Sequence, residues 1–381
     1  MRRSALTAVV AVLSLAGSSA GAAANVHANA RAVCPAAEPG LGAAHCHALV
    51  VTDGVGNPQA STSPTGLSPG TIKSVYSFPT SSTTGAGKTI AIVDAYDDPN
   101  AESDLAVFDV QYGLPACTTS NGCFAKVDQN GGTSYPRTNS GWALEISLDV
   151  QWAHAIAPGA RILLVEASSN SFANLLAAED YARTHAQYVS NSWGGSEFSG
   201  ESSYDSHFAQ SGVSFFVSSG DAGLPAEYPS ASPSVISVGG TTLNFDRSGN
   251  FVSETGWSSG GGGCSAYEKA SSAQSAFSGY AHVNCGGRRA TPDVSLDADP
   301  SSGVSVYDSV RYQGQKGWFQ VGGTSASSPM WAGRSADAGA TVNSAYVYGN
   351  SITYRDITSG NNGAPCLVGY DLCTGRGSWL G

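Results

Sequence analysis

The chain has 381 residues, which is enough for one large α/β domain or for two to three smaller ones. Glycine (47) and proline (17) are frequent and only 12% of the residues are charged, but 41% are hydrophobic, so global disorder is excluded. The net charge of −11 makes nucleic acid and anionic membranes poor partners, because a negative surface repels phosphate groups.

The N-terminus has the pattern of a secretory signal peptide. Arg2 and Arg3 precede an apolar run over residues 5–16, and Ala-Gly-Ala at residues 20–22 is a small-residue cleavage site. We therefore expect residues 1–22 to be removed and the protein to be secreted. No later run reaches the roughly 18 apolar residues of a spanning helix, so no membrane partner is expected.

Residues 23–68 are predicted to form a short propeptide or flexible linker, because Ala, Pro and Gly are frequent there and apolar periodicity is weak. The eight cysteines of an exported chain predict disulfides, although about 105 connectivities are open. Their spacing favours pairing in sequence order: Cys34/Cys46, Cys117/Cys123, Cys264/Cys285 and Cys366/Cys373. Zinc is the weaker alternative, because no C-x-x-C or H-x-x-x-H spacing occurs.

Residues 69–381 are predicted to form one domain of alternating strands and helices. The expected strands are 89–93, 161–166, 188–192, 214–218 and 235–238. The expected helices run from the Asp98-Pro99 start signal to about Tyr112, over 142–157 and over 173–185. This alternation predicts an α/β fold with a mostly parallel central sheet and helices on both faces. Active sites of such sheets gather at the carboxyl ends of the strands.

Ser325 is the first candidate for chemistry. It lies in the segment GGTSASSP at residues 322–329, whose glycines permit a tight turn from strand to helix and whose proline suits an early helical position. Ser325 would then lie at a helix N-terminus, with its hydroxyl exposed and its backbone N–H facing a developing anion. The alternative is an ordinary helix N-cap serine.

Glu145 and Asp149 are the candidate base for this serine, because no histidine lies in a matching motif. The two residues are four apart and share one face of a predicted helix that is otherwise mostly apolar. Two carboxyl groups held together cannot both ionise easily, so the pKa of one rises. The alternative is a solvated acidic helix face.

Two further aspartates follow predicted strands. Asp221 comes shortly after the strand that ends at Ser218, where it either caps a turn or, if buried and protonated, donates a hydrogen bond to an oxyanion. Asp94 ends the strand over 89–93, and without a partner histidine motif we expect it to be structural.

The motifs E-x-x-L-D, S-S-G-D-x-G and G-T-S-x-x-x-P, in this order along the chain, resemble the sedolisin family of serine-carboxyl peptidases, which have a subtilisin-like fold. The resemblance extends over roughly residues 66–381. It implies that Ser325 is the nucleophile, Glu145 its base and Asp149 the group that orients Glu145. It also implies that Asp221 stabilises the oxyanion.

The same resemblance implies binding sites for substrate and for calcium. The implied substrate-binding edge is Ser192, Trp193, Gly194 and Gly195, and the segments 260–265 and 292–294 also resemble the family. The implied calcium ligands are the carboxylates of Asp356 and Asp371 and the backbone carbonyls of Ile357, Leu367 and Gly369. Oxygen-only ligation suits this hard cation.

The sequence therefore predicts a secreted, monomeric endopeptidase that cleaves protein or peptide substrates through an acyl-enzyme, with an acidic pH optimum. One alternative is an inactive secreted binding protein that keeps the fold. A second alternative is a subtilisin-like peptidase that uses Asp94, Ser325 and a histidine such as His154.

Overall fold

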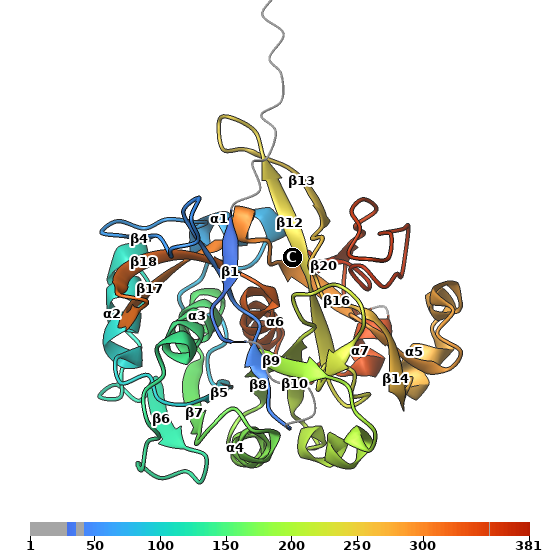
Figure 1. The fold of residues 1–381 in the computed structure, drawn as a ribbon, viewed down its shortest axis with the longest axis horizontal. Coiled ribbons are helices and arrows are strands. Elements are labelled where there is room, and N and C mark those ends of the chain that lie inside the picture. The colour runs from blue at the N-terminus through green and yellow to red at the C-terminus, as the bar shows by residue number, and fades with distance from the viewer. Residues whose placement is uncertain (1–28, 36–41, 350) are drawn as a thin grey trace, which may run out of the picture.

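The computed structural model describes residues 29–35, 42–349 and 351–381 (Figure 1). The predicted signal peptide, residues 1–22, lies outside the described residues. Among the described residues, no helix has both the length and the apolar character needed to cross a membrane.

A mostly parallel central sheet runs through the middle of the molecule. In spatial order its strands are β13 (Phe251–Gly256), β12 (Ile236–Phe245), β10 (Ser214–Ser218), β8 (Tyr188–Asn191), β5 (Thr89–Ala95), β7 (Arg161–Ala167) and β6 (Phe124–Asp128), and β16 (Val294–Asp297) also pairs with β12. All of these pairings are parallel except that of β12 with β13. The inner strands are almost fully buried, as expected for a sheet covered on both faces, whereas the edge strands β13 and β6 are partly exposed.

Helices cover both faces of this sheet, so the predicted α/β architecture is confirmed. Helices α3 (Ser140–Ile156) and α6 (Thr324–Ala338) pack together on one face, and α4 (Phe172–His185) covers the other (Figure 1). The remaining helices are α1 (Pro69–Tyr76), α2 (Ala101–Tyr112), α5 (Ser272–Ala276) and α7 (Ser344–Tyr348), with 3-10 turns at Glu201–Phe208, Ser278–Val283 and Pro300–Ser302.

The predicted elements agree with the observed ones except at their ends. Helix α2 begins at Ala101 rather than at the Asp98-Pro99 signal. A carboxylate oxygen of Asp98 accepts a hydrogen bond from Asn100 N at 2.9 Å, so Asp98 stabilises a turn ahead of the helix instead of its first turn. Strand β12 continues to Phe245, well beyond the predicted end at residue 238, because its second half pairs with β13.

The described part of residues 23–68 is not the flexible linker that its composition predicts. Its four short strands join two sheets that lie beside the central one. The first sheet contains β1 (Ala30–Ala32), β3 (Leu49–Val51), β4 (Ala60–Ser61), β17 (Val304–Tyr312) and β18 (Gln315–Gly322). The second contains β2 (His45–Cys46), β9 (Trp193–Ser196) and β11 (Glu227–Tyr228). Strands of two or three residues are too short to show a period in the sequence, and the domain boundary at residue 68 stays a prediction.

Four disulfides join the cysteines in sequence order, as their spacing predicts. They are Cys34–Cys46, Cys117–Cys123, Cys264–Cys285 and Cys366–Cys373. Each closes a loop of 6 to 21 residues within one region of the fold. Two further small sheets, β14 (Gly263–Lys269) with β15 (Arg288–Thr291) and β19 (Tyr354–Arg355) with β20 (Ser378–Trp379), complete the C-terminal half.

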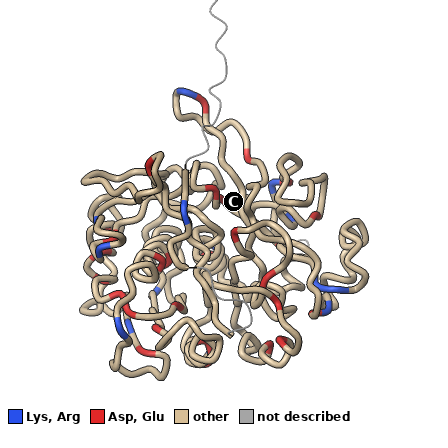
Figure 2. Tube along the Cα trace, in the orientation of Figure 1, with Lys and Arg blue, Asp and Glu red and all other residues tan. Residues whose placement is uncertain are grey.

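The acidic excess of the chain is visible along its whole trace, where Asp and Glu are more widely distributed than Lys and Arg (Figure 2). Several of the acidic residues are buried. Among them, Asp94, Glu145, Asp149, Glu166 and Glu179 have no exposed surface. Burying so many carboxyl groups costs folding free energy unless each group is paired or protonated. These positions are therefore candidates for a structural or a catalytic role.

Candidate active site

Helix α3 carries Glu145 and Asp149 into the interior of the protein. Both residues are fully buried, because α6 and the central sheet cover the helix, so the alternative of a solvated acidic face is wrong. Burial, and then the neighbouring carboxyl groups of Asp149 and Asp94, hold the pKa of Glu145 well above its usual value. Burial also raises the pKa of Asp149. The pair therefore takes up and releases protons as a unit.

Ser325 is the second residue of α6, and its N-cap is Gly323. Gly323 has φ 94°, which allows the tight turn from β18 into the helix. Ser325 makes no N-capping hydrogen bond, so the alternative of an ordinary capping serine is wrong. Its hydroxyl donates instead to the backbone carbonyl of Ser192 at 3.3 Å. The first backbone N–H groups of α6 are bonded outside the helix, that of Thr324 to Asp221 at 2.8 Å and that of Ser325 to His47 O at 3.2 Å.

The serine and the two carboxyl groups meet between α3 and α6. The Ser325 hydroxyl partly opposes the rise in the pKa of Glu145, and the Ser192 side chain does the same for Asp149. The four carboxyl oxygens of Glu145 and Asp149 are buried without a formed hydrogen bond to any described residue. Catalytic hydrogen bonds are often long before substrate binds, so this arrangement suits a base that tightens on its nucleophile during reaction.

Asp221 lies at the start of α6, next to Thr324. One carboxyl oxygen accepts hydrogen bonds from the backbone N–H of Thr324 at 2.8 Å and from its hydroxyl at 2.9 Å. The other oxygen, Oδ2, is buried and unpartnered among the described residues. Burial raises the pKa of Asp221 to about 7. Below that pH the group is a neutral acid whose free oxygen can carry a proton toward an anion.

Of the two other segments that resemble the family, 260–265 contacts the loop that carries Asp221, and 292–294 leads into β16 in the interior. Gly261 N donates to Gly220 O at 2.7 Å, which fixes the loop that carries Asp221. Asp293 is buried and paired with Arg289, whose Nη1 lies 2.6 Å from Oδ1 of the aspartate. These contacts hold the loops in place and offer no exposed reactive group.

Asp94, at the end of β5, is also fully buried and faces the carboxyl pair of α3. Burial, and then Asp149 and Glu166, raise its pKa well above the usual value. Its carboxyl oxygens have no hydrogen-bond partner among the described residues. The site therefore contains a third protonatable carboxyl group, and the structural role expected for Asp94 stays a prediction.

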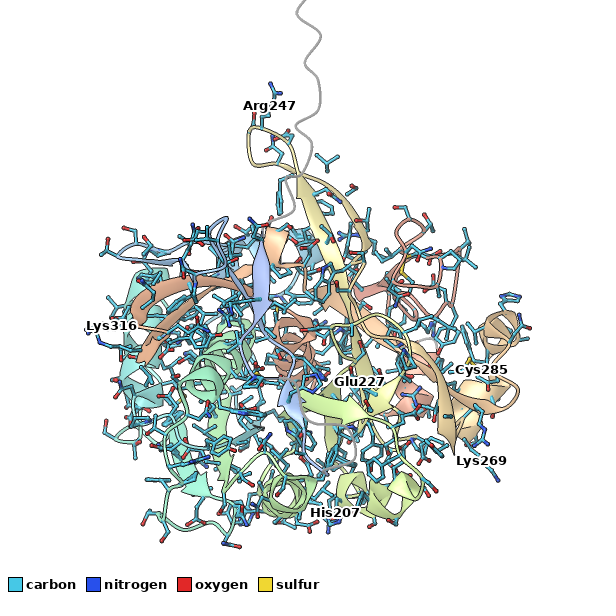
Figure 3. The ribbon with its side chains drawn as sticks, viewed as in Figure 1. His207, Glu227, Arg247, Lys269, Cys285 and Lys316 are labelled. Carbon is cyan, nitrogen blue, oxygen red and sulfur yellow. A yellow bond between two sulfur atoms is a disulfide. The ribbon has the colours of Figure 1, made fainter. Side chains whose placement is uncertain are left out.

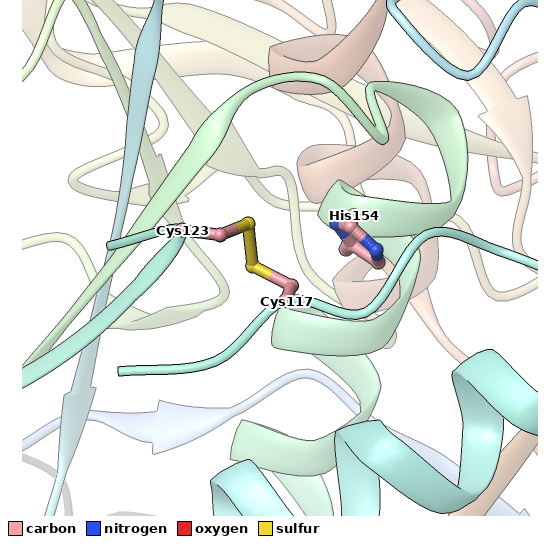
Figure 4. Close-up of side chains that lie close together, drawn as sticks. All are labelled: Cys117, Cys123 and His154. Atoms are coloured by element: carbon pink, nitrogen blue, oxygen red, sulfur yellow. A yellow bond between two sulfur atoms is a disulfide. The ribbon is translucent and has the colours of Figure 1, made fainter. Parts of the chain in front are cut away.

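His154 does not contact Ser325 or Asp94; it lies next to the Cys117–Cys123 disulfide (Figure 4). It lies nine residues beyond Glu145 on α3, about 13 Å along the helix axis. Its Nε2 lies 3.0 Å from the carbonyl oxygen of Pro115 and 3.3 Å from Asp109, beside the Cys117–Cys123 disulfide. Burial lowers its pKa to about 4. A histidine held there cannot act as the base for Ser325.

The predicted substrate-binding edge, Ser192 to Gly195, forms the start of β9 and is held against β5 because Trp193 Nε1 donates to Val93 O at 2.9 Å. The sequence analysis missed two polar residues beside it, Ser218 at the end of β10 and Glu227 on β11. Figure 3 shows Glu227 next to β9 and β2. A pocket of about 630 Å³ adjoins this edge, lined in part by Glu227 and Tyr267. No motif in the sequence connects these residues, which only the fold brings together.

The predicted calcium ligands lie around the loop closed by the Cys366–Cys373 disulfide. The backbone N–H of Gly369 donates to Asp356 at 2.9 Å, and that of Leu367 donates to Asp371 at 2.6 Å. These bonds bring both carboxylates to one loop. Burial raises the pKa of Asp371 to about 6, although its carboxyl oxygens accept the N–H groups of Leu367, Cys373 and Thr374. The donor set is all oxygen, so the residues fit a hard divalent cation.

Comparison with known proteins gives a consistent picture. Residues 131–356 match the sequence model of the Subtilase family. The chain is 30% identical to kumamolisin from Bacillus sp. (strain MN-32) over 366 residues, covering 84% of this chain and 63% of kumamolisin. It is 34% identical to sedolisin from Pseudomonas sp. (strain 101) over 209 residues, covering 45% of this chain and 34% of sedolisin. The chain thus spans less than two thirds of the length of these curated relatives.

A solved structure has the same fold. Pseudomonas sedolisin, described as a serine-carboxyl proteinase complexed with two molecules of pseudo-iodotyrostatin, superposes with a TM-score of 0.69 at 28% identity. The superposition covers 83% of this chain and 96% of that chain. Nearly the whole of the solved relative is therefore represented in this protein.

Proposed function

Because the chain belongs to the sedolisin family and has its subtilisin-like fold, we propose that it is a secreted serine-carboxyl endopeptidase. Ser325 is the nucleophile, Glu145 its general base and Asp149 the group that orients Glu145. Asp221 and the backbone N–H of Ser325 stabilise the oxyanion. The observation that supports this proposal most strongly is that α3, α6 and the loop after β10 bring these four residues together from distant parts of the chain.

In the proposed reaction the Ser325 hydroxyl adds to the carbonyl carbon of the substrate while Glu145, in the enzyme form in which this carboxyl group is ionised, takes the hydroxyl proton. The negative charge that develops on the carbonyl oxygen meets the N-terminus of α6 and the neutral carboxyl group of Asp221. Glu145 then returns the proton to the departing amine, and water hydrolyses the ester on Ser325. Burial supports the proton transfer, because it raises the proton affinity of the Glu145 carboxylate toward that of the serine hydroxyl.

The alternatives have less support. The location of His154 argues against a Ser-His-Asp triad. The inactive binding protein is not favoured, because the buried, unpartnered carboxyl groups of the site have a cost that catalysis explains. The solved relative is also named a proteinase.

We further propose protein or peptide substrates, a monomeric enzyme and calcium bound by the 356–371 segment. Calcium would be held by Asp356, Asp371 and three carbonyl groups, and it would supply charge neutralisation and rigidity rather than chemistry. The four disulfides support export to an oxidising compartment.

Ser325→Ala tests the central proposal. We expect kcat/KM on a mixed peptide library at pH 4 to fall at least a thousandfold, because the nucleophile is lost. Ser327→Ala is the matched control, since its hydroxyl lies in the same turn of α6 and bonds only locally, to Thr324 O at 2.8 Å. We expect this variant to keep its activity within about threefold. Activity that survives in purified Ser325→Ala protein would remove Ser325 from the mechanism.

A further inference from the structure

Two histidines and a glutamate meet above strand β9. His45 and His47 are alternate residues of an extended segment, so both side chains point to the same face of it. Glu227 reaches the same place from β11, on the other side of β9. One possible ligand atom from each of the three residues lies within 4.8 Å of the other two. The H-x-H spacing suits a strand, whereas H-x-x-x-H suits a helix, so no helical zinc motif could reveal this group.

Strand β9 leaves the space in which the three side chains meet. It lies between β2 and β11, and its Gly194 pairs with His45 in the register. A Cβ on Gly194 would lie 2.8 Å from Cε1 and 3.2 Å from Nε2 of His47. Because glycine has no Cβ, side chains from the two outer strands can approach each other above the middle one.

His47 already has the orientation of a metal ligand. Its ring is buried, and Nδ1 lies 2.6 Å from Ser218 Oγ. The Ser218 hydroxyl donates to Asn191 O at 3.4 Å, so its oxygen can accept the proton of Nδ1. With that proton fixed on Nδ1, Nε2 presents to Glu227 either a second proton or a metal ion. Histidines that bind metals usually have such an oxygen partner on the other ring nitrogen.

The distances suit a tetrahedral ion. Nε2 of His47 lies 3.0 Å from Oε2 of Glu227. Two ligand atoms at zinc bond lengths of about 2.0–2.2 Å, seen at a tetrahedral angle, are roughly 3.3–3.5 Å apart. A small movement of either side chain therefore opens enough room for the ion. The third ligand atom, on His45, is within 4.8 Å of both, so all three donors can reach one metal.

His45 supplies an observation that the contact between His47 and Glu227 does not explain. Its Nδ1 is buried and has no hydrogen-bond partner among the described residues. A ring that only packed against the other two side chains would leave this atom unsatisfied, at a cost in free energy. His45 and Glu227 also line the pocket of about 630 Å³, so a fourth coordination position would be open to water.

A second group of possible ligands in the described part of the chain does not compete with this one. Cys117, Cys123 and His154 also lie close together, but the two sulfur atoms form a disulfide (Figure 4). A disulfide has no thiolate to offer a metal. The group above β9 is therefore the better metal site.

We propose that His45, His47 and Glu227 bind one divalent transition-metal ion of the zinc type, with water as the fourth ligand. Two imidazole nitrogens and one carboxylate oxygen suit such an ion, whereas calcium and magnesium take oxygen ligands. The ion would hold β2 to β11 across β9 and stabilise the folded chain, as any ligand of the folded state does. This inference is independent of the proposed peptidase function, because it requires no reaction at Ser325.

Ser325→Ala protein without an affinity tag tests this site. The protein is stripped with a chelator and returned to a buffer that contains calcium at pH 7, because the ligands must be deprotonated. Titration calorimetry with Zn²⁺ measures stoichiometry and affinity, and the visible spectrum of added Co²⁺ reports the coordination number. We expect one Zn²⁺ per chain, a higher melting temperature with the ion and a four-coordinate Co²⁺ spectrum. Absence of Zn²⁺ binding, or six-coordinate Co²⁺, would overturn the proposal.

His45→Gln is the most specific variant, because it removes one ligand and leaves the contact between His47 and Glu227 in place. We expect the affinity for Zn²⁺ to fall at least about a hundredfold in this variant and in Glu227→Gln. In Ser218→Ala, which removes only the oxygen that orients His47, it should fall about tenfold.

His207→Gln is the matched control. His207 also pairs with a carboxylate, Asp180 at 3.0 Å, but lies at the periphery of the molecule (Figure 3). Its substitution should leave the affinity for Zn²⁺ unchanged. Binding that both His45→Gln and Glu227→Gln retain at full strength would place the ion elsewhere and overturn the assignment of these ligands.

Discussion

Asp221 determines at which pH the proposed oxyanion site has its full set of donors. Its Oδ1 is used by Thr324, which leaves Oδ2 as the only oxygen that can donate, and it donates only when it is protonated. Because burial raises the pKa of Asp221 to about 7, the neutral form predominates below that pH and the anion above it. An anion at this position repels the charge that develops on the substrate.

We therefore predict that kcat/KM falls as the pH rises through about 7, and that Asp221→Asn removes this decrease. Asparagine is neutral at every pH and keeps an N–H donor, so its activity, although lower by about ten- to a hundredfold, should no longer decline above neutrality. A profile from pH 4 to 9 measures both effects. Asp180→Asn, a surface change beside Arg183, is the control and should follow the wild type. A decrease that persists unchanged in Asp221→Asn would assign the titration to another group.

The acidic residues of this site could be predicted from the sequence, whereas the polar residues around them could not. Glu145 and Asp149 could be found because two acids four apart on an apolar helix are locally unfavourable and need an explanation. Glu227 and His47 could not be found, because neither belongs to a motif in its own segment. Each is identified only by its contact with the other, about 180 residues away in the sequence. The two alternatives for Ser325 could be separated only by its position inside α6.

At the scale of elements, the loop from Cys366 to Cys373 joins the C-terminal segment into one unit. Its N–H groups bond Asp356 and Asp371, and the disulfide closes it at the base. Carboxylate and carbonyl oxygens gathered on one closed loop are the donors that a hard cation takes, and this supports the proposed calcium site.

We predict that calcium raises the melting temperature by several degrees and that EGTA reverses this rise, since an ion that binds only the folded chain stabilises it by about 2.7 kcal/mol at a hundred times its Kd. Asp356→Asn should abolish the response. Asp246→Asn is the control, because Asp246 also accepts N–H groups of its own loop but has no second carboxylate beside it. Scanning calorimetry in the Ser325→Ala background avoids proteolysis by the enzyme itself during the measurement. A response that Asp356→Asn retains would place the ion elsewhere.

The elements were predictable to different degrees for a physical reason. Helix α3 and strand β5 are long apolar segments whose pattern is independent of their partners, and both appear where predicted. Strand β2 has two residues and exists only because β9 offers it an edge. Composition could not distinguish such a segment from a linker, because β2 forms only where the edge of β9 supplies its hydrogen-bond partners. The residues of β2 themselves carry no strand pattern.

The whole molecule buries far more acid than base, and this governs its response to pH. Burial raises the pKa of Glu166 and of Glu179 to about 8 and that of Asp98 to about 7. An unfolded carboxyl group titrates near pH 4, so between pH 4 and 8 the folded chain holds protons that the unfolded chain has lost. The unfolded state then binds fewer protons, and stability must fall as the pH rises across this range. This is the reverse of ordinary acid denaturation.

We predict that the melting temperature of Ser325→Ala is highest near pH 4 to 5 and falls by several degrees or more toward pH 8. Glu179 is the clearest contributor, because it is fully buried on α4 and the charge it acquires has no basic partner in its immediate hydrogen-bonding reach. Glu179→Gln cannot ionise, so its melting temperature should decline less between pH 5 and 8. Glu102→Gln on α2 is the matched control, because Glu102 is only half-buried and its carboxylate accepts hydrogen bonds from Thr119; it should keep the full decline. A melting temperature that rises from pH 5 to 8 would mean that these carboxyl groups are ionised in the folded protein, and it would remove the physical basis for both an acid-stable fold and a protonated Asp221.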